Sequence, residues 1–302
     1  MRLGRVATAV AAIMLVGARA PERPPITGIS HLAVYSRDLA AAERFYVGVL
    51  GARSETNPEN PAGRRFALSG TQYVEVLPAP PGLGASLFAH AGYRTADAAA
   101  LRGWLLANGA RDVGALAGRP GDRWFAARDA EGNQVQFVET RTSDAAVPGA
   151  VSGRIIHVGH AVRDRAAQDG FYRRLLGFRP YWLGSFEPPK VDWVSQQTPD
   201  GRDWLEYMMV GQGSRVTEAS LDARQLGVLN HLSLGVRNMQ TAVTELYRGK
   251  KMTGRHDGPQ MGLDGKWQAN LYDPDGTRIE LMEFHAVTEP CCSPFTAPDP
   301  EG

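Results

Sequence analysis

One pattern occurs four times in the chain, and it limits the fold more than any other sequence feature. Each copy begins with a histidine and carries aspartate or asparagine seven positions later: His31–Asp38, His90–Asp97, His157–Asp164 and His231–Asn238. The closing Asp or Asn is a preferred helix N-cap, and a helical pattern follows it. The sequence therefore predicts four repeated units, each opening with a strand and then a helix.

The repeated units alternate in kind. Residues 39–53 and 165–179 both contain Phe-Tyr and then Leu-Gly, with Gly51 and Gly177 as helix stop signals, and the other two helical stretches differ from them. Each unit closes with strands, most clearly in residues 266–284, where two strands flank the turn Asp-Pro-Asp-Gly. We therefore predict an α+β fold of four βαβββ modules, in which a pair of modules is used twice.

The repeat also divides the chain. A length of 302 residues suffices for about two domains. Residues 141–152 are small and polar and contain proline and glycine, so we interpret them as a linker between domains at 27–142 and 153–285. Residues 286–302 are rich in proline and predict an irregular tail.

Residues 1–20 differ from the rest of the chain. A short basic start precedes an apolar run from Val6 to Gly17 and then Ala18-Arg19-Ala20. This pattern is typical of a secretory signal peptide and is too short to span a membrane. Cleavage is expected after Ala20, or after Ala18 because Pro21 hinders the later cut. A buried N-terminal helix or an uncleaved anchor is the alternative, but no helix cap supports it, so we predict export, periplasmic or secreted, without stable membrane insertion.

Composition excludes some partners and some forms of stabilisation. The chain has 33 basic and 32 acidic residues, and a net charge of +1 gives no electrostatic basis for binding nucleic acid or anionic membranes. The two cysteines, Cys291 and Cys292, are adjacent, and Cα atoms about 3.8 Å apart are closer than in most disulfides. The core is therefore not stapled by disulfides. A loop pair without a role, metal capture or pairing with another molecule all remain open.

Alternation along the strands separates the repeated histidines from the core. His231 lies on the face opposite a row of leucines, and His157 holds the equivalent place in the third unit. His160 lies on the apolar face and is interpreted as a core or partly exposed histidine. In the closing strands, Glu206 and Glu280 both lie on the less apolar face.

The spacing of these residues indicates a metal site. The distance from His157 to Glu206 is 49 residues, and the distance from His231 to Glu280 is also 49. Imidazoles and carboxylates suit Zn²⁺, Fe²⁺, Mn²⁺ or Ni²⁺, and a mid-strand glutamate among apolar residues needs a partner. The sequence therefore predicts that these four residues bind a divalent metal ion of open identity, in preference to four solvated or separately paired side chains.

The first half repeats the set less completely. His31, Glu75 and His90 fall at equivalent positions, but the fourth position is Gln136. Glutamine is neutral and is a poorer ligand for a divalent ion. The sequence leaves open whether this set binds a second metal or is a degenerate, structural half.

Two stretches resemble signatures of the vicinal oxygen chelate superfamily. HLAVYSRDLAAAERFYVGVLGAR (31–53) is similar to its first-strand signature and LYDPDGTRIELMEF (271–284) to its last-strand signature. The superfamily includes glyoxalase I, bleomycin-binding proteins and extradiol ring-cleaving dioxygenases, and the resemblance covers residues 27–285. It implies two cupped-sheet domains, each made by a pair of modules around a metal. Carried over, the ligands are His157, Glu206, His231 and Glu280, with open metal positions for two neighbouring substrate oxygens.

The four-ligand set resembles glyoxalase I. This resemblance implies lyase or isomerase chemistry on a small substrate chelated through vicinal oxygens, with Glu206 or Glu280 as the base. We take this as the main expectation, although an exported protein is not expected to meet cytosolic glutathione adducts. Non-catalytic binding or resistance proteins form another alternative, but they lack the metal ligands that this chain keeps. Five aromatic residues are candidates for lining an apolar pocket or for packing: Trp182, Phe186, Trp193, Trp204 and Trp267.

The arrangement of four modules in one chain instead resembles extradiol dioxygenases. That resemblance implies a metal site of His157, His231 and Glu280, with His256 as a catalytic residue beside the metal. The position expected for a family tyrosine holds Asn270, with Tyr272 nearby. The sequence does not name the substrate or the oligomeric state.

Overall fold

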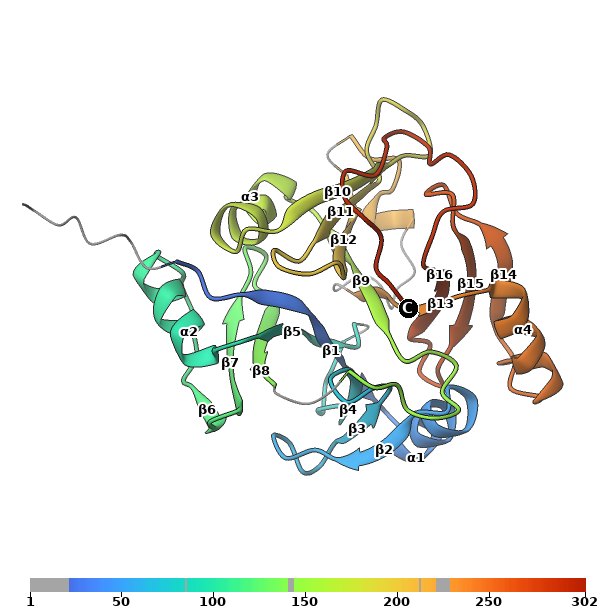
Figure 1. Cartoon of the computed structure of the whole chain (residues 1–302), viewed down its shortest axis with the longest axis horizontal. Coiled ribbons are helices and arrows are strands. Elements are labelled where there is room, and N and C mark those ends of the chain that lie inside the picture. The colour runs from blue at the N-terminus through green and yellow to red at the C-terminus, as the bar shows by residue number, and fades with distance from the viewer. Residues whose placement is uncertain (1–21, 85, 141–143, 212, 221–228) are drawn as a thin grey trace, which may run out of the picture.

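The computed structural model describes residues 22–84, 86–140, 144–211, 213–220 and 229–302 (Figure 1). The predicted signal peptide lies outside the described residues. Within the described ranges, no helix is long and apolar enough to cross a membrane.

The first half of the chain folds into one curled sheet of eight strands in the order β2-β3-β4-β1-β5-β8-β7-β6. A short α1 runs into the π-helix η1, and α2 follows β5. The elements are β1 (Ile26–Ser36), α1 (Leu39–Glu43), η1 (Arg44–Val49), β2 (Arg53–Thr56), β3 (Arg64–Ala67), β4 (Tyr73–Pro78), β5 (Phe88–Thr95), α2 (Ala98–Ala107), β6 (Ala117–Arg119), β7 (Asp122–Arg128) and β8 (Gln134–Glu139).

The second half repeats this plan with the order β10-β11-β12-β9-β13-β16-β15-β14. Both halves therefore contain two βαβββ modules whose first strands pair at the centre of the sheet, which confirms the predicted fold class (Figure 1). The elements are β9 (Ile155–Val162), α3 (Arg165–Asp169), η2 (Gly170–Leu175), β10 (Arg179–Gly184), β11 (Trp193–Gln197), β12 (Trp204–Met209), η3 (Glu218–Ser220), β13 (Leu229–Val236), α4 (Met239–Arg248), β14 (His256–Met261), β15 (Trp267–Tyr272) and β16 (Arg278–Glu283).

The four repeated caps begin the four helices that follow the modules' first strands. In each case the side chain accepts a hydrogen bond from the backbone N–H three residues later, at Asp38, Asp97, Asp164 and Asn238. The predicted stop glycines, Gly51 and Gly177, have φ values of 72° and 84°, a left-handed conformation that favours glycine. The repeat therefore fixes both the start and the end of these segments.

The two halves dock through reciprocal turns. Asp275, in the turn before β16, accepts hydrogen bonds from Ser36 Oγ at 2.6 Å and Arg37 N at 3.1 Å. In the same way, Glu131 accepts from the backbone N–H groups of Arg163 and Asp164 at 2.7 and 2.8 Å. Module 1 thus docks on module 4, and module 3 docks on module 2.

The repeated Phe-Tyr pairs complete this docking. Tyr46 and Tyr172 are fully buried, and each donates its hydroxyl to an aspartate in the other half. The hydroxyl of Tyr46 lies 3.1 Å from Asp273 Oδ2, and that of Tyr172 lies 3.4 Å from Asp129 Oδ2. The alternation of helix types along the sequence therefore reflects which helices face the opposite half.

Residues 286–302 contain no helix or strand, yet they pack on the second sheet. Asp299 accepts a hydrogen bond from the fully buried Lys266 at 2.6 Å, which ties the tail to the start of β15. Cys291 and Cys292 form a disulfide with each other, a pairing that the spacing argument disfavoured. Because it joins neighbours, this disulfide staples no part of the core.

Candidate metal centres

Strand register brings the four predicted ligands of the second half to one place. β12 pairs in parallel with β9, and β16 pairs in parallel with β13. In both pairs the glutamate lies opposite the residue two positions after its module's histidine, so histidine and glutamate project from the same face. His160 lies on the other face, buried and stacked on Tyr207, as expected of a core histidine.

The donor atoms of this C-terminal site converge. His157 Nε2 lies 2.6 Å from His231 Nε2 and 3.3 Å from Glu280 Oε2. Glu206 Oε2 lies 3.8 Å from His231 Nε2, and the donor atoms of Glu206, His157 and His231 all lie within 4.8 Å of one another. Glu280 Oε2 is buried and accepts no hydrogen bond within the described ranges. Two imidazoles, two carboxylates and this unsatisfied oxygen fit a divalent cation.

Neighbouring residues hold these ligands in position. Ser195 donates to Glu206 Oε1 at 2.9 Å, and Trp204 stacks on His157 with ring centroids 4.4 Å apart. A Cβ atom at Gly159 would lie 2.3 Å from the His231 ring, so only glycine fits there. No sequence pattern indicated Ser195, because its contact depends on the register of the β11–β12 hairpin.

The two carboxylates of the C-terminal site differ in charge state. Burial, and then the nearby Glu280 charge, raise the pKa of Glu206 to about 8. Burial also opposes ionisation of Glu280, but His231 and His157 outweigh it and lower its pKa to about 2. Burial lowers the pKa of both histidines, which favours the neutral imidazoles that metals bind. The site without metal therefore carries one ionised carboxylate and one protonated carboxyl at neutral pH.

Arg278 also reaches this site, and only its alternation with Glu280 along the strand indicated this in the sequence. Its Nη2 lies 2.7 Å from His231 Nδ1. A guanidinium only donates, so Nδ1 accepts, and the proton of a neutral His231 ring sits on Nε2. A metal that binds Nε2 therefore requires the other tautomer, in which the ring proton lies on Nδ1 and the hydrogen bond from Arg278 is broken.

A cavity of about 470 Å³ opens beside these ligands. Glu206, His231 and Glu280 line it, together with Arg278 and Gln268. Three of the five predicted aromatic residues also line it, namely Trp182, Phe186 and Trp193. Trp204 is instead buried beneath His157, and Trp267 is not among the lining residues. The site is thus reachable by a small molecule with an apolar part.

The structure does not bring His256 to this site. His256 is exposed, and its Nδ1 lies 2.8 Å from the carbonyl oxygen of Thr253. It pairs with Leu271, whose side chain lies in the core, so it projects from the face opposite the metal ligands. Asn270, paired with Glu280, faces the site instead.

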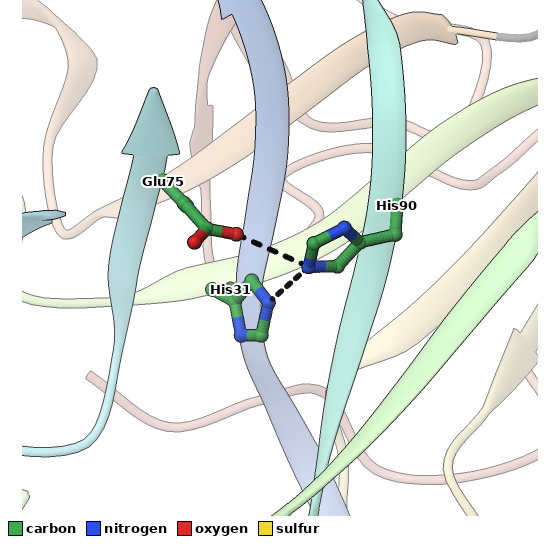
Figure 2. Close-up of side chains that lie close together, drawn as sticks. All are labelled: His31, Glu75 and His90. Atoms are coloured by element: carbon green, nitrogen blue, oxygen red, sulfur yellow. Dashed lines mark hydrogen bonds and ion pairs between the residues drawn. The ribbon is translucent and has the colours of Figure 1, made fainter. Parts of the chain in front are cut away.

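The N-terminal half forms a second cluster, drawn in Figure 2. His31 Nε2 lies 3.0 Å from His90 Nε2, which lies 3.2 Å from Glu75 Oε2. Burial opposes ionisation of Glu75, but His90 and His31 lower its pKa to about 2, and burial holds the pKa of His31 well below its usual value. Gln136, at the fourth position, donates to Glu59 at 2.7 Å.

Comparison with known proteins agrees with this geometry. Residues 28–137 match the model of the Glyoxalase/Bleomycin resistance protein/Dioxygenase superfamily. Comparison with the curated proteins finds no match.

Several solved structures are similar over most of the chain. A catechol 2,3-dioxygenase has a TM-score of 0.63 at 17% identity, covering 92% of this chain and 94% of that one. The E323L mutant of homoprotocatechuate 2,3-dioxygenase from Brevibacterium fuscum has a TM-score of 0.62 at 17% identity, covering 91% and 74%. The homoprotocatechuate 2,3-dioxygenase from Arthrobacter globiformis has a TM-score of 0.61 at 18% identity, covering 86% and 80%.

The chain therefore has the vicinal oxygen chelate fold in both halves, and residues 28–137 belong to the superfamily by sequence, which confirms the resemblance. The likeness to dioxygenases at these identities concerns the fold.

Proposed function

We propose that the chain is an exported, divalent-metal-dependent enzyme that cleaves the ring of a small catechol-like substrate, in the manner of extradiol dioxygenases. One observation carries the proposal: the donor atoms of His157, His231 and Glu280 converge, and His231 and Glu280 line an open cavity while His157 lies buried behind them. A site of two histidines and one carboxylate with open positions is typical of non-haem Fe²⁺ oxygenases. The whole-chain likeness to a catechol 2,3-dioxygenase supports this reaction over the lyase chemistry that the ligand set alone favoured.

Residues of the cavity have distinct tasks in this proposal. His157, His231 and Glu280 would hold the metal, which when bound supplies Lewis acidity toward two neighbouring substrate oxygens. Arg278 is a cation at the cavity wall and would orient an ionised substrate oxygen. The rings of Trp193 and Phe186 would pack against the substrate ring and exclude water.

Oxygen consumption tests the proposal. Protein reloaded with Fe²⁺ or Mn²⁺ under anaerobic conditions is mixed with a panel of catechols in air-saturated buffer. We expect one molecule of O₂ consumed per substrate, with a ring-opened product identified by mass spectrometry. Glu280→Gln should abolish the uptake, whereas Glu55→Gln, at a half-buried glutamate on β2, serves as the matched control. Metal-loaded protein that consumes no O₂ with any catechol would contradict the proposal.

A lyase or isomerase is the second candidate, and Glu206 is the observation that favours it. Ser195 holds this second carboxylate beside the three metal ligands, and its pKa near 8 is close enough to neutral pH for the group to take up and release a substrate proton. If proton transfer is the reaction, Glu206→Gln should slow turnover about 10²- to 10⁴-fold. The wild type should then exchange a substrate proton with ²H₂O without O₂. If dioxygenation is the reaction, the same variant should stay within about tenfold of wild type, because it leaves His157, His231 and Glu280 in place.

Sequestration without chemistry would give a third outcome. Tight binding of a small ligand, with neither O₂ uptake nor proton exchange, would favour a binding or resistance protein.

A further inference from the structure

The N-terminal cup gathers metal ligands from three adjacent strands. His31 lies on β1, Glu75 on β4 and His90 on β5, and their donor atoms lie within 4.8 Å of one another (Figure 2). The three residues are 0%, 2% and 6% exposed, respectively. A cluster of two imidazoles and a carboxylate buried this deeply requires compensation, and a divalent cation would supply it.

A fourth oxygen is directed toward the same cup. Gln136 pairs with Gly92, two residues after His90, so its side chain projects from the histidine face, as that of Glu280 does in the other half. Its Nε2 is tied to Glu59, and its Oε1 is buried and accepts no hydrogen bond in the described part of the chain. An amide carbonyl is a neutral ligand, weaker than the Glu280 carboxylate but able to complete a four-coordinate site.

Outer residues orient the ligands as they do in metal sites. Asn57 donates a hydrogen bond to Glu75 Oε1, which leaves Oε2 directed toward His90. Ser30 Oγ lies 3.1 Å from His31 Nδ1 and can accept its proton, so the Nε2 lone pair of His31 is available. Tyr73 stacks on the His31 ring, with centroids 4.6 Å apart and planes 8° from parallel.

The connection between β2 and β3 covers this cup. It carries Asn57, which is 2% exposed, and Glu59, which bonds both Gln136 and Arg65. The corresponding β10–β11 connection of the other half carries Phe186, which is 50% exposed and lines the cavity. Protein groups thus occupy in the N-terminal half the side from which a substrate reaches the C-terminal half.

We propose that the N-terminal cup is a second metal site, in which His31, His90 and Glu75 bind a structural Zn²⁺ ion with Gln136 Oε1 as the fourth ligand. Zn²⁺ suits the site because closed, four-coordinate sites of nitrogen and oxygen ligands are typical of structural zinc. The site does not depend on the reaction proposed for the C-terminal cup.

Metal content of the full chain tests the site. Protein is stripped with chelator, reloaded with Zn²⁺, dialysed and measured by mass spectrometry of the metal. We expect two ions per chain in the wild type and one in Glu75→Gln. The same measurement should give one ion in Glu280→Gln and none in the double variant. Glu55→Gln should keep two. An ion count in Glu75→Gln equal to that of the wild type would overturn the proposal.

Two further measurements test whether a lost ion reflects misfolding of a variant, and they distinguish the N-terminal site from the C-terminal site. Asn57→Ala keeps every ligand and should weaken N-terminal binding about 10- to 100-fold, read by competition with a chromogenic chelator. In the Glu280→Gln background, where only the N-terminal site remains, chelator should lower the melting temperature by several degrees. An unchanged melting temperature would rule out a structural ion. A wild type with two ions but no O₂ uptake would contradict the proposed reaction and leave the N-terminal site standing.

Discussion

The two cups share one scaffold and differ in three places. The fourth position is Gln136 in the N-terminal cup and Glu280 in the C-terminal cup. A loop bearing Asn57 covers the first cup, whereas a cavity of about 470 Å³ opens on the second. An open position separates catalytic metal sites from structural ones. The duplicated fold therefore supports one closed cup and one accessible cup.

The two cups also differ in the group that contacts Nδ1 of a ligand histidine. His31 Nδ1 faces a serine hydroxyl, which can accept its proton, whereas His231 Nδ1 faces the Arg278 guanidinium, which can only donate. The N-terminal cup is thus arranged for a resident ion. In the C-terminal cup, binding an ion through His231 Nε2 would require the ring proton to move to Nδ1 and the contact with Arg278 to break.

The largest effect should come from the paired ligand variants. Glu280→Gln removes a carboxylate beside the cavity, and we expect turnover to fall at least about 1000-fold, since metal catalysis contributes several kcal/mol. Glu75→Gln should cost thermal stability instead, because its cup has no role in turnover. Steady-state rates and melting curves of both variants check the contrast. Equal losses of turnover in the two variants would break it.

Next in size is the contact between the tail and the C-terminal cup. Lys266 is fully buried, bonds Asp299, and lies 5.1 Å from the Trp204 ring that stacks on His157. Lys266→Met should lower the free energy of unfolding by about 3 kcal/mol, because it leaves a partly buried carboxylate without its cation. Urea titration measures this. His285→Gln, which touches the same carboxylate from an exposed position, should change it by less than about 0.5 kcal/mol.

A smaller effect is expected on the pH dependence of metal binding in the two cups. With its pKa near 8, Glu206 is protonated at pH 7. As a fourth ligand it would have to lose that proton, so C-terminal affinity would rise up to about tenfold per pH unit below pH 8, whereas a site of His157, His231 and Glu280 alone would lack this rise. With a pKa near 2, Glu75 is already ionised and releases none. Calorimetry in two buffers of different ionisation enthalpy counts the protons, on Glu75→Gln for one cup and Glu280→Gln for the other. In the Glu206→Gln variant, the protons that Glu206 releases on metal binding should no longer be detected.

The smallest effects should appear where the halves dock. Tyr46→Phe should destabilise the protein by about 1 kcal/mol through the lost bond to Asp273. Tyr172→Phe should cost less, because its bond to Asp129 is 3.4 Å long and Gln168 still donates to that carboxylate at 2.9 Å. Thermal denaturation of both variants ranks them. The reverse order would show that the two contacts are not equivalent.

Much of the fold could be predicted, because the same caps, stop glycines and spacings recur in several modules and so support one another. The caps and stop glycines are local signals, because each determines a helix end only a few residues away. The equal 49-residue spacings place His157 with Glu206 and His231 with Glu280, since parallel pairing of a module's first and last strands keeps the same register in both modules. Site geometry could therefore be inferred without any knowledge of the loops.

What could not be predicted depends on registers and long-range packing. Ser195 and Asn57 reach the ligands only through the pairing of hairpins, which their own sequence does not fix. The sequence predicted His256 as a catalytic residue beside the metal. In the structure it pairs with Leu271, so its side chain projects from the face opposite the metal ligands. The Lys266–Asp299 pair joins residues 33 positions apart through an irregular tail that has no periodic signal.

The reciprocal docking of turns has a consequence for how the halves stay together. The turn at Asp129–Glu131 holds the corner at Arg163, and the turn at Asp273–Asp275 holds the corner at Ser36. Such an arrangement, in which each partner offers the other the same two surfaces, is the geometry of a twofold-symmetric dimer. The two halves thus contact each other within one chain as the two copies of such a dimer would, and the same docking contact is made twice.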